Sequence, residues 1–142
     1  MNLTKKILIV EDDTFMQDFY KAIFKKIGGD IIILENTNDI IEKIEKGEVG
    51  LIIMDINLRN TFLEDKRTDG IKFARYLKQY FSEMNIPILL ITAYPVSSLG
   101  ENFLEESMAD DYLIKPIVDY NKLIEKINNL VLKTYERQSS YR

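Results

Sequence analysis

The sequence predicts an α/β fold built on one doubly wound, five-stranded parallel sheet. Three observations lead to this prediction. Five short apolar runs are spread along the 142 residues, and such runs are typical of parallel strands that are covered on both faces. Amphipathic stretches with helical spacing alternate with these runs. No internal repeat and no Pro- or Ser-rich linker divides the chain, so we expect a single domain over residues 1–142.

The predicted strands consist mostly of aliphatic residues, and the predicted helices have apolar residues at three- and four-residue steps. The strands are 7–10, 31–34, 51–54, 86–92 and 112–114, and the helices are 16–27, 40–44, 71–81, 97–108 and 123–132. Gly28 and Gly47 follow the first two helices, as is typical of helix ends. We expect a core from about 5 to 135, a frayed polar tail at 136–142 and no output domain in this chain.

Five strand–helix units with right-handed crossovers favour the flavodoxin-like strand order 2-1-3-4-5. In this order the first and third strands are neighbours, and the direction of winding reverses between them. Ligands of such sheets bind beyond the carboxyl ends of the strands at that point.

Composition excludes several classes of site. The chain has no Cys and no His, which removes disulfides, thiolate or imidazole metal ligands, and His-assisted nucleophiles. A formal net charge of −4 argues against direct binding of nucleic acid. No apolar run approaches the roughly 18 residues of a membrane-spanning helix, and the N-terminal run is too short for a signal peptide. We therefore expect a cytoplasmic protein without a membrane segment.

Carboxylates follow the first and third predicted strands. Glu11, Asp12 and Asp13 end the first, and Asp55 ends the third. Carboxylates held together repel one another and need a cation, and a sparse set of oxygen ligands favours Mg²⁺. Either group alone is equally consistent with a polar loop after a strand. Their convergence at one edge of the sheet makes the metal site the better explanation.

Thr92 and Lys115 end the fourth and fifth predicted strands on the same edge. Alone, Thr92 is an ordinary β-branched strand residue and Lys115 an ordinary surface lysine. Together with the carboxylates they provide a nucleophile, a hydroxyl and an ammonium, which are the groups that phosphoryl transfer uses. The pattern predicts that Asp55 is the nucleophile and forms an acyl phosphate.

Four segments in this order resemble the successive signatures of response regulator receiver domains. They are 6–13 (KILIVEDD), 51–58 (LIIMDINL), 87–93 (PILLITA) and 111–116 (DYLIKP). The resemblance covers about residues 5 to 135. It implies that Glu11 and Asp12 are the acidic pair that holds Mg²⁺, with Asp12 the direct ligand. Asp55 would be the phosphoacceptor and a further ligand, and the backbone carbonyl of Asn57 would complete the coordination.

The resemblance also assigns the residues around the phosphoryl group. Thr92 would donate its hydroxyl to a phosphoryl oxygen, and Lys115 would pair with the phosphate. A cis bond before Pro116 would direct Lys115 into the site. Tyr112 would be the aromatic switch residue, which turns inward when Thr92 moves toward the phosphate.

The function that the resemblance implies is a switch rather than an enzyme with turnover. A sensor histidine kinase or a histidine phosphotransfer protein would donate the phosphoryl group, and the domain would slowly hydrolyse it. The conformational change would be read at the surface of the fourth helix, fifth strand and fifth helix, through homodimerisation or partner docking.

Two features depart from the receiver pattern. Arg59 stands where receivers commonly have proline, and the loop 59–69 is longer than usual by roughly half a dozen residues. This loop is either a tolerated solvated insertion or an element that shapes kinase recognition or shields the acyl phosphate.

The resemblance also suggests a role for Tyr94. Its side chain would flank the path of the attacking water and slow hydrolysis of the phosphoryl group.

Three alternatives share parts of this pattern. A haloacid-dehalogenase-type phosphatase would have its nucleophile on the first strand and a second Asp at the position of Asn57. A flavodoxin-like FMN-binding protein would need a phosphate-binding loop in place of residues 11–13. A receiver-shaped interaction module that is never phosphorylated is the third alternative.

Overall fold

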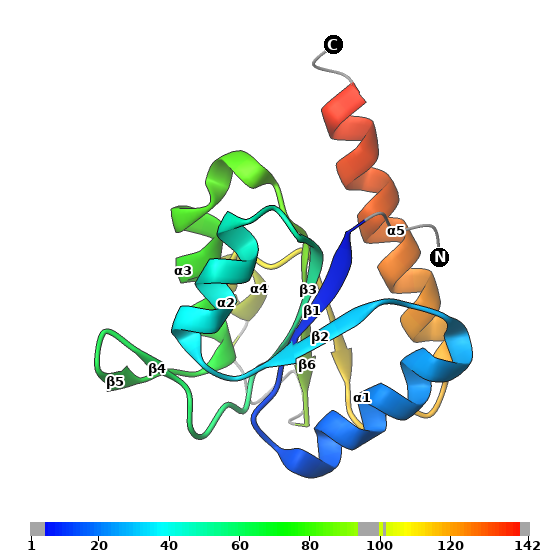
Figure 1. Ribbon diagram of the computed structural model, residues 1–142, viewed down its shortest axis with the longest axis horizontal. Coiled ribbons are helices and arrows are strands. Elements are labelled where there is room, and N and C mark those ends of the chain that lie inside the picture. The colour runs from blue at the N-terminus through cyan, green and yellow to red at the C-terminus, as the bar shows by residue number, and fades with distance from the viewer. Residues whose placement is uncertain (1–4, 94–99, 101, 140–142) are drawn as a thin grey trace.

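Five parallel strands form one sheet in the computed structural model, which describes residues 5–93, 100 and 102–139, with side chains described up to Thr134 (Figure 1). The strands are β1 (Lys6–Val10), β2 (Ile31–Leu34), β3 (Val49–Asp55), β6 (Ile88–Thr92) and β7 (Asp111–Ile114). Their order is β2-β1-β3-β6-β7, which confirms the predicted 2-1-3-4-5 arrangement, because β4 and β5 belong to a separate hairpin.

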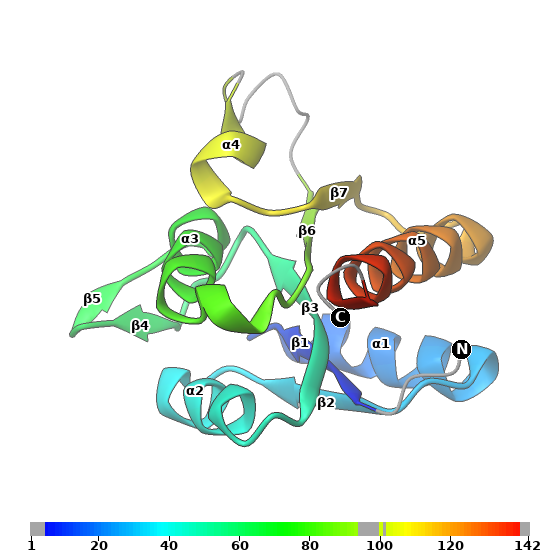
Figure 2. The same cartoon turned by 90° about the horizontal axis from the view of Figure 1, so that it is seen from above.

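Helices cover both faces of the sheet. They are α1 (Thr14–Ile27), α2 (Thr37–Glu45), α3 (Gly70–Tyr80), α4 (Phe103–Ser107) and α5 (Tyr120–Ser139), and a short 3₁₀ helix spans Ser82–Met84. Figure 2 shows α1 and α5 on one side and α2 and α3 on the other. No helix among the described residues combines the length and the apolar character that crossing a membrane requires.

The two-sided cover explains the continuous apolar runs. Successive strand side chains point to opposite faces, so Ile7 and Ile9 pack against α1 and α5, while Leu8 and Val10 pack beneath α2 and α3. All four side chains are fully buried. A strand in such a sheet has no polar face, and its sequence shows no alternation.

Asp13 and Gly28 mark the two ends of α1. The Asp13 side chain caps the helix by accepting a hydrogen bond from the Met16 amide at 3.1 Å. At the other end Gly28 adopts a left-handed conformation with φ of 71°, as the predicted helix end requires. Asp13 is therefore engaged in local structure, although it neighbours the residues predicted to bind metal.

Two predicted boundaries differ from the structure. Within the described part of 97–108, helix covers only Phe103–Ser107, and residues 97–99 and 101 lie outside the described residues. The prediction of a frayed tail from residue 136 is wrong for 136–139, because α5 continues to Ser139. Glu136, Arg137 and Gln138 are good helix formers, so a helix already begun extends through them at low cost.

The long loop 59–69 contains a β-hairpin that the sequence did not predict. Its strands are β4 (Phe62–Leu63) and β5 (Lys66–Arg67), which pair antiparallel. Glu64 and Asp65 connect them with φ of 52° and 65°, the two left-handed residues of a type I′ turn. The hairpin projects beside α2 and α3 (Figures 1 and 2).

Candidate functional site

A cavity of about 410 Å³ opens at the carboxyl ends of β1 and β3. Its lining includes most of the residues predicted from the sequence, namely Glu11, Asp12, Asp55, Asn57 and Lys115. Since β1 and β3 are paired along their length, the residues that follow them meet at one edge of the sheet. The sheet order therefore assembles this pocket from residues that are far apart in the sequence.

Lys115 lies between two carboxylates in this pocket. Its Nζ atom is 3.3 Å from Oδ1 of Asp55 and 3.7 Å from Oε1 of Glu11. Both acids are almost completely buried, with 4% of Asp55 and none of Glu11 exposed. The Lys115 amide donates to the Thr92 carbonyl at 2.7 Å, and the Lys115–Pro116 bond is cis, as predicted.

Glu11 is the most deeply buried carboxylate of the pocket. Neither of its carboxylate oxygens has a hydrogen-bond partner among the described residues. Burial, together with the neighbouring Asp55 carboxylate, raises the pKa of Glu11 to about 9, although the Lys115 ammonium acts in the opposite direction. A buried carboxylate with no hydrogen-bond partner and one ammonium at 3.7 Å favours either a proton or a further cation.

Asp12 faces the loop that follows β3. Its Oδ2 atom accepts hydrogen bonds from the backbone amides of Arg59 and Asn60, both at 2.7 Å. Among the described residues, no three His, Cys, Asp or Glu side chains are gathered closely enough to hold one metal ion. The Lys115 ammonium lies between Glu11 and Asp55, and Asp12 is turned toward the loop.

Two residues predicted to respond to phosphorylation occupy different environments. Thr92 is fully buried at the end of β6. Tyr112 is half-buried, with its ring packed edge-on against Phe103 at 5.2 Å between centroids. Lys126 Nζ lies 5.9 Å from the centre of the same ring. Tyr94, which the resemblance places beside the path of the attacking water, lies outside the described residues.

Residues 7–128 match the family described as the response regulator receiver domain. The chain belongs to this family. As a receiver domain it is the switch domain of a two-component response regulator, a class whose members interact with histidine kinases or phosphotransfer proteins. The family match decides against the phosphatase and FMN-binding alternatives, since both are separate families.

Curated relatives and solved structures agree with this assignment. The chain is 29% identical to the uncharacterized transcriptional regulatory protein YvcP of Bacillus subtilis, over 94% of this chain and 52% of that protein. It is 27% identical to the aerobic respiration control protein ArcA of Escherichia coli, over 96% and 55%. The chain thus spans about half the length of these two relatives. A CheY-like receiver domain protein from Methanospirillum hungatei superimposes with a TM-score of 0.74 at 26% identity, over 94% of this chain and 98% of that one.

Gly70 is a site residue that the sequence reasoning missed. It begins α3, and its amide donates to the Ile56 carbonyl at 2.9 Å. A Cβ atom on Gly70 would lie 2.1 Å from the backbone oxygen of Asp55. The adjacent Asp69, which caps α3 through the Lys72 amide, marks a helix start in the sequence. Nothing local indicates that this start lies against the backbone of Asp55.

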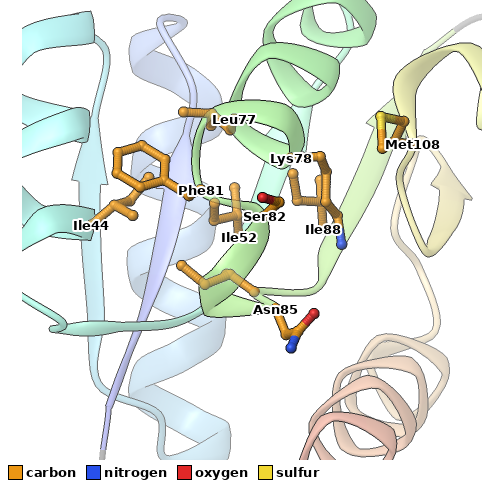
Figure 3. Close-up of a pocket in the computed structure, with 10 residues that line it drawn as sticks. Ile44, Ile52, Leu77, Lys78, Phe81, Ser82, Asn85, Ile88 and Met108 are labelled. Carbon is orange, nitrogen blue, oxygen red and sulfur yellow. The ribbon is translucent and has the colours of Figure 1, made fainter. Parts of the chain in front are cut away.

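A second cavity of the receiver domain, of about 180 Å³, lies near the amino ends of β3 and β6 (Figure 3). Its lining is largely apolar and includes Ile52, Leu77 and Ile88. It contains none of the residues predicted to carry chemistry. The polar pocket at the opposite ends of the strands is therefore the candidate site.

Replacing Lys115 with methionine tests the charge balance of the pocket. We expect Lys115→Met to destabilise the domain by about 1–3 kcal/mol in metal-free buffer, because it leaves Glu11 and Asp55 buried without a cation. Urea unfolding at neutral pH with a chelator measures this loss. Lys126→Met is the control, since the more exposed pair of Lys126 with Asp111 contributes about 0–1 kcal/mol. Equal losses in the two variants would contradict the expectation.

Proposed function

We propose that Asp55 accepts a phosphoryl group from a phosphohistidine of a sensor kinase or phosphotransfer protein, with the help of Mg²⁺. The observation that carries this proposal is the contact of the Lys115 ammonium with the Asp55 carboxylate, 3.3 Å apart, inside a pocket that opens to solvent. A nucleophile, a fixed positive charge and space for a phosphoryl group are thereby present at one place.

The residues have complementary roles in the transfer. An Asp55 carboxylate oxygen attacks phosphorus while the bond from phosphorus to the donor imidazole nitrogen breaks, and the electron pair of that bond leaves with the imidazole. Lys115 neutralises charge on the phosphoryl oxygens, and the Thr92 hydroxyl donates to one of them. The buried setting of Asp55 strengthens these interactions relative to water.

The acids around Asp55 have the donor chemistry of a divalent-cation site, although among the described residues no three acidic side chains lie close enough together to share one ion. Glu11 brings two oxygens without hydrogen-bond partners among the described residues, and Asp12, Asp55 and the carbonyl of Asn57 add further hard oxygen donors. Such a set suits Mg²⁺. The carboxylates of Glu11, Asp12 and Asp55 and the Lys115 ammonium together carry a net negative charge that one divalent ion cancels. Mg²⁺ would therefore reduce the repulsion between the pocket and an anionic phosphoryl group.

The signal would be a shift between two conformations of the domain. Phosphorylation would favour the one in which Thr92 approaches the phosphate and Tyr112 turns inward. Tyr112 is half-buried, so an inward turn would bury more of its ring. The surface of α4, β7 and α5 would present it to a second copy of the domain or to another protein. The domain would act as a switch that assists its own phosphorylation and dephosphorylation.

Labelling by a small phosphodonor tests the proposed function. We expect the protein to take up one phosphoryl group from acetyl phosphate with Mg²⁺, in a hydroxylamine-labile linkage, and none with a chelator. Beryllofluoride with Mg²⁺ should change the tyrosine fluorescence. A protein that neither becomes labelled nor responds to beryllofluoride would instead be a receiver-shaped interaction module.

Asp12 variants test the metal site. We expect Asp12→Ala to weaken Mg²⁺ binding by more than tenfold, because it removes a ligand and the acceptor of two loop amides. Asp12→Asn is the matched comparison, since it keeps a neutral acceptor but loses the charge. Calorimetric titration with MgCl₂ measures both affinities. Wild-type affinity in Asp12→Ala would rule out Asp12 as a ligand.

A further inference from the structure

The base of the β4–β5 hairpin, residues 59–62 together with residue 68, is attached directly to the acidic pocket. The amides of Arg59 and Asn60, which lead into the hairpin, both donate to Oδ2 of Asp12. The Asp12 carboxylate is also the one to which the proposed function assigns the metal. One side chain thus belongs to the pocket and to the inserted hairpin.

Two threonine side chains and one further threonine amide hold the same hairpin base from other directions. The Thr37 hydroxyl at the start of α2 donates to the Phe62 carbonyl in β4. Thr61 has only 1% of its surface exposed, and its hydroxyl lies 3.4 Å from both Asp12 Oδ2 and the Glu35 carbonyl. The Thr68 amide closes the base by donating to the Thr61 carbonyl at 2.9 Å. The base is therefore fixed by side chains, not only by its two short strands.

Most side chains of the hairpin are exposed. Phe62 has 48% of its surface exposed, and the Arg67 guanidinium carbon lies 5.9 Å from the centre of its ring. Asn60 lines both the acidic pocket and a neighbouring cavity of about 320 Å³ beside the hairpin. A change in the conformation of the hairpin base would therefore alter a solvent-exposed surface beside the acidic pocket.

We propose that the hairpin base positions Asp12 for Mg²⁺, and that Mg²⁺ in turn stabilises the hairpin. This inference rests on the proposed function. A carboxylate held by two amide hydrogen bonds has lost most of its rotational freedom before the metal arrives, and such supporting contacts strengthen metal binding. Linkage between two equilibria is reciprocal. If attachment of the hairpin to Asp12 raises the Mg²⁺ affinity by some factor, bound Mg²⁺ raises the equilibrium constant for attachment of the hairpin by the same factor.

Amide hydrogen exchange of the unmodified protein is the first test. With saturating MgCl₂ we expect exchange at the Arg59 and Asn60 amides to slow several-fold. The Ile88 amide is the control, because it also donates to a carboxylate, Asp110 Oδ2 at 2.8 Å, but at the amino end of β6. Its exchange should not change. Equal exchange at Arg59 and Asn60 with and without Mg²⁺ would overturn the proposal.

The reverse effect is tested by loosening the hairpin at a point that does not touch Asp12. We expect Thr37→Val to weaken Mg²⁺ binding by about three- to tenfold, at or below the usual range for supporting contacts. Thr134→Val is the matched control, since it removes a hydroxyl-to-carbonyl bond to Leu130 within α5 and should leave the affinity unchanged. If Thr37→Val does not fold, the exchange experiment decides alone.

The outcomes separate this inference from the proposed function. Unchanged Mg²⁺ affinity in Thr37→Val, with normal binding by the wild-type protein, would overturn the coupling and leave the phosphoacceptor function intact. Absence of Mg²⁺ binding by the wild-type protein would overturn both. Weaker binding by Thr37→Val together with slower exchange in Mg²⁺ would support the coupling.

Discussion

We expect Asp55→Asn to reduce labelling by acetyl phosphate at least a hundredfold, because an amide is a far weaker nucleophile than the carboxylate and cannot form a stable acyl phosphate. The substitution keeps the size of the side chain in a position that is 4% exposed, so the fold should be retained. Phosphate-affinity electrophoresis after incubation with acetyl phosphate and Mg²⁺ measures the effect.

Asp13→Asn is the matched control for this experiment. Asp13 lines the same pocket, but its side chain caps α1, and Asn caps helices as well as Asp does. Labelling should persist in this variant. Mg²⁺-dependent labelling that survived in Asp55→Asn would show that the phosphoryl group goes to another residue.

Gly70→Ala should cause the largest loss of stability among the substitutions considered, about 3 kcal/mol or more, as expected when added volume meets atoms that cannot move. The new Cβ would lie 2.1 Å from the Asp55 carbonyl oxygen and 2.7 Å from Cα of Ile56. Both atoms belong to backbone held in the sheet region, where the Ile56 amide donates to the Ile91 carbonyl at 2.8 Å. Urea unfolding measures the loss, and labelling should fall as well because Asp55 must shift.

Gly50→Ala provides the comparison for Gly70→Ala. A Cβ at Gly50 would meet only the side chain of Lys5, at 3.0 Å from its Cβ atom, near the beginning of the described chain. That neighbour can adjust, so the loss should be small. Similar unfolding midpoints for the two variants would show that the close approach of Gly70 to Asp55 does not constrain the fold.

The sequence alone determined the sheet and the identity of the polar residues at its edge. Strands buried on both faces have uninterrupted apolar runs, and amphipathic helices have apolar residues at three- and four-residue steps. The local sequence therefore predicts each of these elements. Once the strand order is known, the residues after β1, β3, β6 and β7 must share one edge. The sequence therefore predicts that Glu11, Asp55 and Lys115 lie together, and the structure confirms it with Lys115 3.3 Å from Asp55 and 3.7 Å from Glu11.

Only the tertiary structure decided how those residues are used. Asp12 and Asp13 are adjacent and chemically identical, yet one holds the amides of Arg59 and Asn60 and the other caps α1. The hairpin has two residues in each strand, too few to show a period, and its turn is Glu64-Asp65 rather than a sequence that favours left-handed backbone. The closeness of Gly70 to Asp55 joins residues in different elements. Such features depend on contacts between distant segments, and no local pattern in the chain records them.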